Sequence, residues 1–336
     1  MNKKILLFAL IFSMILANCV KRQKAIGGAD DIYVFASDAT REILGQAIDT
    51  TFSYGIRTPE FEKYYFTKWK PLDDFTQSVN YKNIILIADL NRKDVAYEIA
   101  RGILPEKTFQ MAEKDSVFMF SIPDNWADGQ MFILIAGKDL KRIQRNILEQ
   151  KGWLYGKFVK NFEEFQSKYQ YARLEQTKLE KYFRQKYRWS MRIPHDYIIV
   201  KEIPEKNFVW LGRGLPYRWI SVSWEDGMYT EWLTANGLYD KRNQIGELYG
   251  GNVTEKRFLG YEYTKLGEYD ALKMYGLWYQ QEEAKGGPFA TYAFYDKRTN
   301  RTFVIDMIIF SPGERVSVIF RNIEIMAKTF TTSFKK

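Results

Sequence analysis

The sequence of 336 residues contains one cysteine, Cys19, and one histidine, His195. A single cysteine has no partner for a disulfide bond. A single histidine excludes His-rich metal sites and makes any Ser-His-Asp triad depend on His195. No Gly-x-Ser-x-Gly elbow accompanies it, and His195-Asp196 follows a proline, which predicts a turn at the end of a strand. We therefore predict no catalytic residue, no metal site and no cofactor.

The chain also lacks a strongly apolar N-terminal segment long enough for a permanent membrane span. The apolar run at residues 5–17 covers about 20 Å as a helix, against roughly 30 Å for the hydrocarbon core of a bilayer. Two lysines precede this run, as in a secretory signal, and Leu-Ala-Asn-Cys at 16–19 ends it. That ending resembles the lipobox of bacterial lipoproteins, which implies a signal peptide at 1–18 and acylation of Cys19 with palmitate or a similar chain.

An excess of positive charge raises the question of a nucleic-acid partner, but the export signal argues against one and favours a membrane partner. The formal net charge is +9, and three of the positive charges, Lys21, Arg22 and Lys24, follow the cysteine closely. Near anionic headgroups each contributes about 1 kcal/mol. Val20, with no acidic run after it, resembles outer-membrane lipoproteins that face the periplasm. We therefore expect a lipid-anchored protein of the cell envelope, whose partners are the membrane and another envelope protein.

The first half of the mature chain has the pattern of an α+β domain. Residues 19–31 show no apolar periodicity and predict a flexible tether. Apolar side chains at helical spacing over 39–52 predict a helix, with Ser37 or Asp38 as its N-cap. The runs at 84–88 and 131–136 are continuously apolar and suit central strands covered on both faces. We assign 32–155 to an N-terminal sandwich of helices over a mixed sheet.

A long helical pattern follows the first domain. Between 158 and 187, apolar side chains recur on one face, and Glu164 with Lys168 adds an i,i+4 ion pair in the favourable order. We predict one long connecting helix at 156–188.

The second half, 189–336, alternates aromatic and β-branched residues in short runs, which predicts an antiparallel sheet. Ser-Pro-Gly-Glu at 311–314 predicts a capping box that opens a closing helix. The predicted fold class is therefore α+β, with a long helix joining an N-terminal α/β sandwich to a C-terminal antiparallel-sheet sandwich. The predicted strands are 189–193, 208–211, 219–224, 257–264, 271–279, 291–295 and 302–310.

Aromatic residues make up 17% of the chain. Exposed rings over a groove bind sugars, peptides or lipid, whereas rings in strands also supply core packing. Both interpretations stay open. Trp219 and Trp224 are separated by an odd number of positions, which places them on opposite faces of a regular strand. The binding candidates are Trp210, Trp219, Trp224, Trp232 and Trp278.

Several motifs resemble a family of uncharacterised Bacteroidota lipoproteins, a domain of unknown function that covers most of the mature chain. They are Thr-Pro-Glu-Phe at 58–61, Trp-Ala-Asp-Gly-Gln at 126–130, and Ile-Pro at 193–194 followed by Phe-Val-Trp-Leu at 208–211. None of these motifs is catalytic in form. The resemblance implies a location and an overall shape.

The second half is also similar to the Mog1/PsbP-like fold. The similarity lies in the strand leading to Ile-Pro at 193–194, an aromatic hairpin around 296–300, and the end of the closing helix at 329–334. That fold serves mostly accessory and assembly functions, although fold alone does not fix function. We therefore expect a non-enzymatic binding or assembly accessory in the periplasm. The alternatives are an envelope hydrolase that acts on glycan or peptide through paired carboxylates, or a carrier with an aromatic ligand pocket.

Overall fold

The computed structural model describes residues 22–280 and 282–334. The predicted signal peptide and Cys19 lie outside this part of the chain. The described chain forms two units, one of residues 22–52 and 66–161 and one of residues 53–65 and 162–334. Among the helices of the described ranges, none has both the length and the apolar composition that crossing a membrane requires.

The first unit is built on a mixed five-stranded sheet in the order β4-β1-β5-β7-β6, in which only β6 runs antiparallel to its neighbour. The apolar runs predicted as central strands are β5 and β7, and both are almost wholly buried. The elements are β1 (Asp31–Ala36), α2 (Asp38–Thr51), β4 (Phe66–Pro71), η1 (Leu72–Asp74), β5 (Asn83–Asp89), α3 (Val95–Ile103), α4 (Glu106–Glu113), β6 (Met119–Pro123), β7 (Met131–Gly137), α5 (Leu140–Glu149) and the first part of α6 (Lys151–Tyr171).

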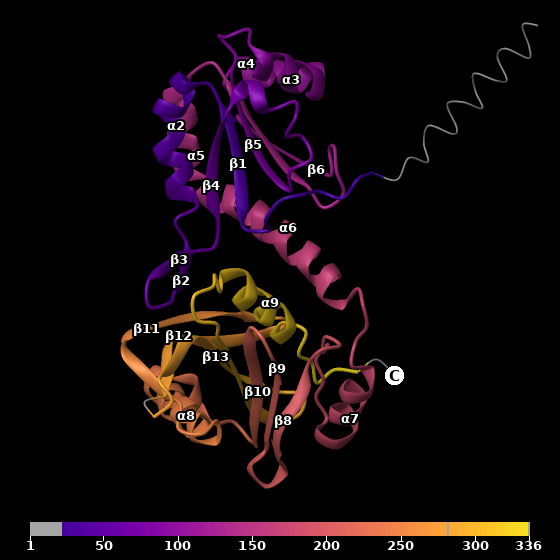
Figure 1. Ribbon diagram of the computed structural model, residues 1–336, viewed down its shortest axis with the longest axis vertical. Coiled ribbons are helices and arrows are strands. Elements are labelled where there is room, and N and C mark those ends of the chain that lie inside the picture. Colours follow the sequence, from indigo (N-terminus) through magenta and orange to yellow (C-terminus); the bar gives the residue numbers. More distant parts are fainter. Residues whose placement is uncertain (1–21, 281, 335–336) are drawn as a thin grey trace, which may run out of the picture. The chain divides into compact units, whose positions relative to one another are not determined.

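Helices cover both faces of this sheet, with α2 and α5 together on one face and α3 and α4 on the other (Figure 1). Ser37 caps α2 as predicted, because its hydroxyl accepts a hydrogen bond from the Thr40 amide at 3.3 Å. The side-chain amide of Gln144, on α5, donates to the backbone carbonyl of Ile43, on α2, at 2.6 Å.

The predicted flexible tether is wrong for its described C-terminal part. The Ala25 amide donates to the Asp128 carbonyl and the Ile26 amide to the Asn80 carbonyl, each at 2.9 Å. Ala25 is buried. Backbone pairing that the composition of this stretch does not reveal therefore fixes it to the first unit.

The second unit contains a seven-stranded antiparallel sheet in the order β11-β12-β13-β14-β10-β9-β8. One face packs against α7 and α9, and the other against α8 (Figure 1). The two-part α+β fold class is thus confirmed. The elements are β2 (Gly55–Arg57), β3 (Phe61–Lys63), α7 (Thr177–Tyr187), β8 (Ile198–Ile203), η2 (Pro204–Lys206), β9 (Phe208–Arg213), β10 (Tyr217–Asp226), η3 (Thr230–Leu233), α8 (Ala235–Leu248), β11 (Val253–Leu266), β12 (Tyr269–Gln280), β13 (Lys285–Asp296), β14 (Arg301–Phe310) and α9 (Ser317–Ala327).

The single helix predicted at 156–188 is two helices, α6 and α7, separated by residues 172–176. No glycine or proline causes the interruption. The Gln176 amide instead donates to the Ile193 carbonyl at 2.8 Å, and Glu175 forms a bridge with Pro194. Tertiary hydrogen bonds thus override helix propensity here. The same region corrects the strand predicted at 189–193, of which only Ser190 pairs, with Thr331.

The capping box predicted at 311–314 is also wrong, because Gly313 adopts a φ of 80° and α9 begins later, at Ser317. The N-terminus of α9 is capped from far away in the sequence. The Glu62 carboxylate, on the β2–β3 hairpin, accepts from the amides of Val316 and Ser317 at 3.0 and 2.8 Å. A carboxylate at this end of a helix is favourable for the helix dipole. This contact explains why residues 53–65 belong to the second unit.

Candidate functional site

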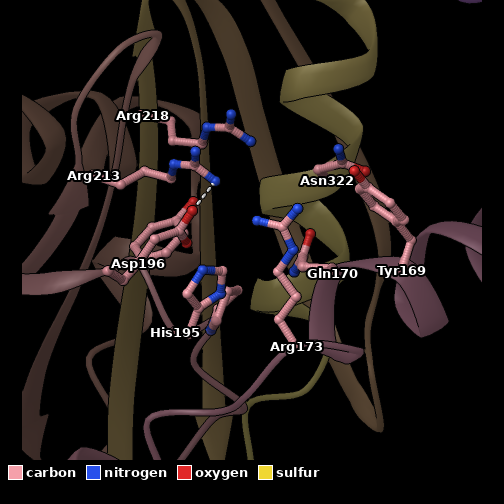
Figure 2. A pocket seen from close by; sticks show the side chains of 10 residues that line it. Tyr169, Gln170, Arg173, His195, Asp196, Arg213, Arg218 and Asn322 are labelled. Atoms are coloured by element: carbon pink, nitrogen blue, oxygen red, sulfur yellow. Dashed lines mark ion pairs between the residues drawn. The ribbon is translucent and has the colours of Figure 1, made fainter.

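A polar pocket of about 290 Å³ opens in the second unit, where the interruption between α6 and α7 meets the sheet and α9. In Figure 2, Arg213, Arg218, Asp196 and His195 lie on one side of the space, and residues of α6, the interruption and α9 lie on the other. We call this the arginine pocket. Its lining residues are Tyr169, Gln170, Arg173, Pro194, His195, Asp196, Tyr197, Arg213, Arg218 and Asn322.

Two arginines of the pocket come from one β-hairpin. Arg213 ends β9, and Arg218 is the second residue of β10. They are direct cross-strand partners in the antiparallel register. Like charges directly opposite each other destabilise a sheet. The fold therefore holds two cations together against their repulsion.

One carboxylate, Asp196, compensates part of this charge. It forms an ion pair with Arg213, and the two side chains are only 27% and 28% exposed. Burial lowers the pKa of Arg218, and neighbouring Arg213 adds to that effect. Among the described residues, Nε of Arg213, Nε of Arg218 and Oδ1 of Asp196 are buried without a hydrogen-bond partner. Such groups cost free energy unless a ligand or water completes their bonding.

The loop that carries His195 and Asp196 is held in place by Gln176. The side-chain amide of Gln176 donates to the His195 carbonyl at 2.8 Å and to the Tyr197 carbonyl at 3.0 Å. Tyr197 is 3% exposed, and its burial raises the pKa of its hydroxyl, which therefore stays neutral at physiological pH. The break in the predicted helix thus places one wall of the pocket.

The opposite wall adds a third cation and an amide. Arg173 lies in the interruption after α6, and Figure 2 shows it reaching into the pocket from that side. Asn322 comes from α9, and its Oδ1 is buried without a hydrogen-bond partner among the described residues. Tyr169 lines the same side of the space in Figure 2 and is 67% exposed.

The charge of the pocket decides its chemistry. Three guanidinium groups face one carboxylate. Guanidinium groups are planar, permanently charged, and match phosphate and carboxylate oxygens with pairs of hydrogen bonds. In residues 22–280 and 282–334, no group of three or more His, Cys, Asp or Glu side chains could hold a metal ion. The arrangement suits the binding of an anion.

The predicted tryptophans do not line the arginine pocket. Trp224 packs in the core on the α9 face of the sheet, and Trp219 packs in the cluster under α8. The prediction of opposite faces is confirmed, but helices cover both faces, so each indole contributes to a core. Trp232 and Trp278 are buried, and Trp210 packs on Tyr249 with the ring centroids 4.7 Å apart. A binding function of these five residues stays a prediction.

His195-Asp196 forms the predicted turn. Arg213 and Arg218 were not predicted as site residues, although they face each other at the end of the β9–β10 hairpin. The available signal was the pair of arginines flanking a short turn in Arg213-Gly-Leu-Pro-Tyr-Arg218. On facing strands, residues placed symmetrically about a turn become partners.

Two family models match the chain. One, described as domain of unknown function DUF8532, matches residues 25–170, and the other, described as domain of unknown function DUF4837, matches residues 176–329. The boundary between them falls where α6 gives way to α7. None of the curated proteins compared with the chain matches it.

Solved structures show weak similarity. The Ran-binding protein Mog1p of Saccharomyces cerevisiae is 12% identical, with a TM-score of 0.31, over 43% of this chain and 89% of Mog1p. A protein of Bacteroides thetaiotaomicron is 15% identical, with a TM-score of 0.27, over 44% and 46% of the two chains. LpqN of Mycobacterium tuberculosis, described as involved in cell envelope biogenesis, is 14% identical, with a TM-score of 0.27, over 43% and 82%. The family matches confirm the predicted resemblance to a domain of unknown function, since models of two such domains match consecutive parts of the chain.

Proposed function

We propose that this protein is a lipid-anchored, non-enzymatic binding protein of the cell envelope, and that its second domain binds an anionic ligand in the arginine pocket. The observation that carries the proposal is the cross-strand pair of Arg213 and Arg218, brought together in a pocket with a single carboxylate, Asp196. A fold selected for stability alone would avoid this pairing. Sites that bind a ligand commonly retain such destabilising arrangements.

The anchor rests on the sequence. The basic residues, short apolar run and Cys19 at the end of that run have the pattern of a lipoprotein signal. The two or three acyl chains of a mature lipoprotein would hold the chain stably, whereas one chain gives marginal binding. We place the protein at the outer membrane facing the periplasm, where a ligand or another envelope protein would reach the arginine pocket.

The binding proposal is tested by calorimetric titration of the chain from residue 20 onward with inorganic phosphate at low ionic strength. Wild type should bind one phosphate for each chain. Arg218→Gln should weaken binding about 10- to 100-fold, because hydrogen bonds to charged groups contribute about 1.5 to 3 kcal/mol each.

Arg257→Gln is the matched control. Arg257 lies on β11, the opposite edge strand of the same sheet, and its side chain is 76% exposed. Its loss should change the phosphate affinity less than twofold. The proposal is wrong if phosphate does not bind at millimolar concentration, or if both variants lose the same affinity.

A further inference from the structure

The arginine pocket contains acceptors as well as cations. Asp196 Oδ1 and Asn322 Oδ1 are both buried, and neither has a hydrogen-bond partner among the described residues. A fully ionised oxyanion offers only acceptor atoms, so it satisfies the guanidinium groups and leaves these two oxygens without donors. A ligand that displaces water from these two oxygens must therefore bring hydrogen-bond donors together with its negative charge.

The size of the pocket agrees with a ligand larger than a bare oxyanion. Its volume of about 290 Å³ corresponds to about ten water molecules of the liquid. A phosphate ion occupies only a fraction of that volume. Asn322, Tyr169 and Gln170 also line the pocket and are polar or aromatic.

Hydroxyl groups are the donors that fit these neighbours best. A hydroxyl both donates and accepts, so it can donate to Asn322 Oδ1 and accept from the amide nitrogen of the same side chain or of Gln170. The exposed ring of Tyr169 at the pocket offers a flat apolar surface for the C–H face of a polyol. An ammonium donor is disfavoured, because three arginines surround the same space.

On this basis we infer that the ligand is a phosphorylated sugar or polyol, whose phosphate lies among Arg173, Arg213 and Arg218 and whose hydroxyl groups bind Asn322 and Asp196. This inference rests on the proposed anion site and specifies its ligand class. The same chemistry occurs in soluble sugar phosphates and in the headgroups of phosphorylated lipids.

Three soluble probes test the inference by calorimetric titration: inositol monophosphate, inorganic phosphate and inositol. Inositol monophosphate should bind about tenfold tighter than phosphate, and inositol alone should not bind detectably. Asn322→Leu should weaken the binding of inositol monophosphate about 3- to 10-fold, which is the effect of losing one or two neutral hydrogen bonds. The loss should be larger for inositol monophosphate than for inorganic phosphate, and a cooperative thermal unfolding transition shows that the variant is folded. Asn322→Ala provides a second variant if the leucine does not fit.

Equal affinity for the two phosphates, or an equal loss of both in Asn322→Leu, would overturn the ligand class while leaving anion binding intact. Absence of binding for both would instead overturn the proposed function. Phosphatidylcholine vesicles with and without phosphatidylinositol distinguish the two sources. Vesicle binding that Arg218→Gln abolishes supports a lipid headgroup, and soluble binding without vesicle binding supports a free polyol phosphate.

Discussion

Replacing Arg218 by glutamine should stabilise the free protein and reduce its thermal stabilisation by phosphate. Two unit charges at roughly 6 to 8 Å repel by about 2 to 3 kcal/mol at an effective dielectric constant of about 20. Asp196 offsets part of this repulsion, and both Arg213 and Asp196 remain partly exposed. We therefore expect a net stabilisation of about 1 kcal/mol, which corresponds to about 2 to 4 °C in Tm for a domain of this size.

Phosphate should reverse the order of the melting temperatures, so that wild type melts above Arg218→Gln. At a concentration 100-fold above its dissociation constant, a ligand stabilises wild type by about 2.7 kcal/mol, or about 5 to 11 °C. Scanning calorimetry of both proteins in phosphate-free buffer and in phosphate measures both effects. Arg257→Gln, as the control, should behave as wild type in each buffer. The reasoning would be refuted if Arg218→Gln melts below wild type without phosphate, or if phosphate raises its Tm as much as it raises that of wild type.

Three further predictions concern the fold, the pocket wall and the anchor. Burial alone would raise the pKa of Glu324, but the nearby Lys273 lowers this pKa overall. The ionised carboxylate therefore stabilises the fold above its unfolded pKa near 4.5. This stabilisation is lost as the pH falls through the pKa of Glu324 in the folded protein. Glu324→Gln should lower the free energy of unfolding in urea at pH 7 by about 2 to 4 kcal/mol, because Lys273, whose side chain is only 15% exposed, loses this partner. It should also weaken the loss of stability at acid pH. Glu163→Gln, in an exposed pair, should cost less than about 1 kcal/mol, and equal losses in the two variants would contradict a stabilising Glu324–Lys273 pair. Gln176→Leu should increase hydrogen exchange of the 194–197 loop and weaken phosphate binding about 3- to 10-fold, since two hydrogen bonds are lost. Unchanged exchange would show that the Gln176 side chain is not needed to hold this loop. Cys19→Ser should move the protein from the membrane to the soluble fraction and prevent labelling by palmitate, and a variant that stays membrane-bound at high salt would disprove the anchor.

Local sequence patterns predict the parts of the fold that depend on local physics. The continuous apolar run of β7 requires burial on both faces, and Ser37 satisfies the first amides of α2, so both features follow from the sequence. The interruption after α6 does not follow, because its cause is a set of hydrogen bonds from Gln176 to a loop that arrives later in the chain. The same applies to α9, which is capped by Glu62.

The candidate site shows the same division. The predicted strands 208–211 and 219–224 follow each other closely, which suits a hairpin, and the hairpin forms. Its function as one wall of a pocket depends on Arg173 and Asn322, which are far from it in the sequence and reach it only through the helix interruption and the packing of α9. Helical and strand periodicity contain no information about that convergence.

Crystals of the chain soaked in arsenate, an isostere of phosphate, test the central claim most directly through anomalous diffraction. We predict a strong arsenic peak within hydrogen-bond distance of Arg213 and Arg218, and its absence in Arg218→Gln crystals. An empty arginine pocket in wild-type crystals, with arsenate bound elsewhere or not at all, would contradict the account.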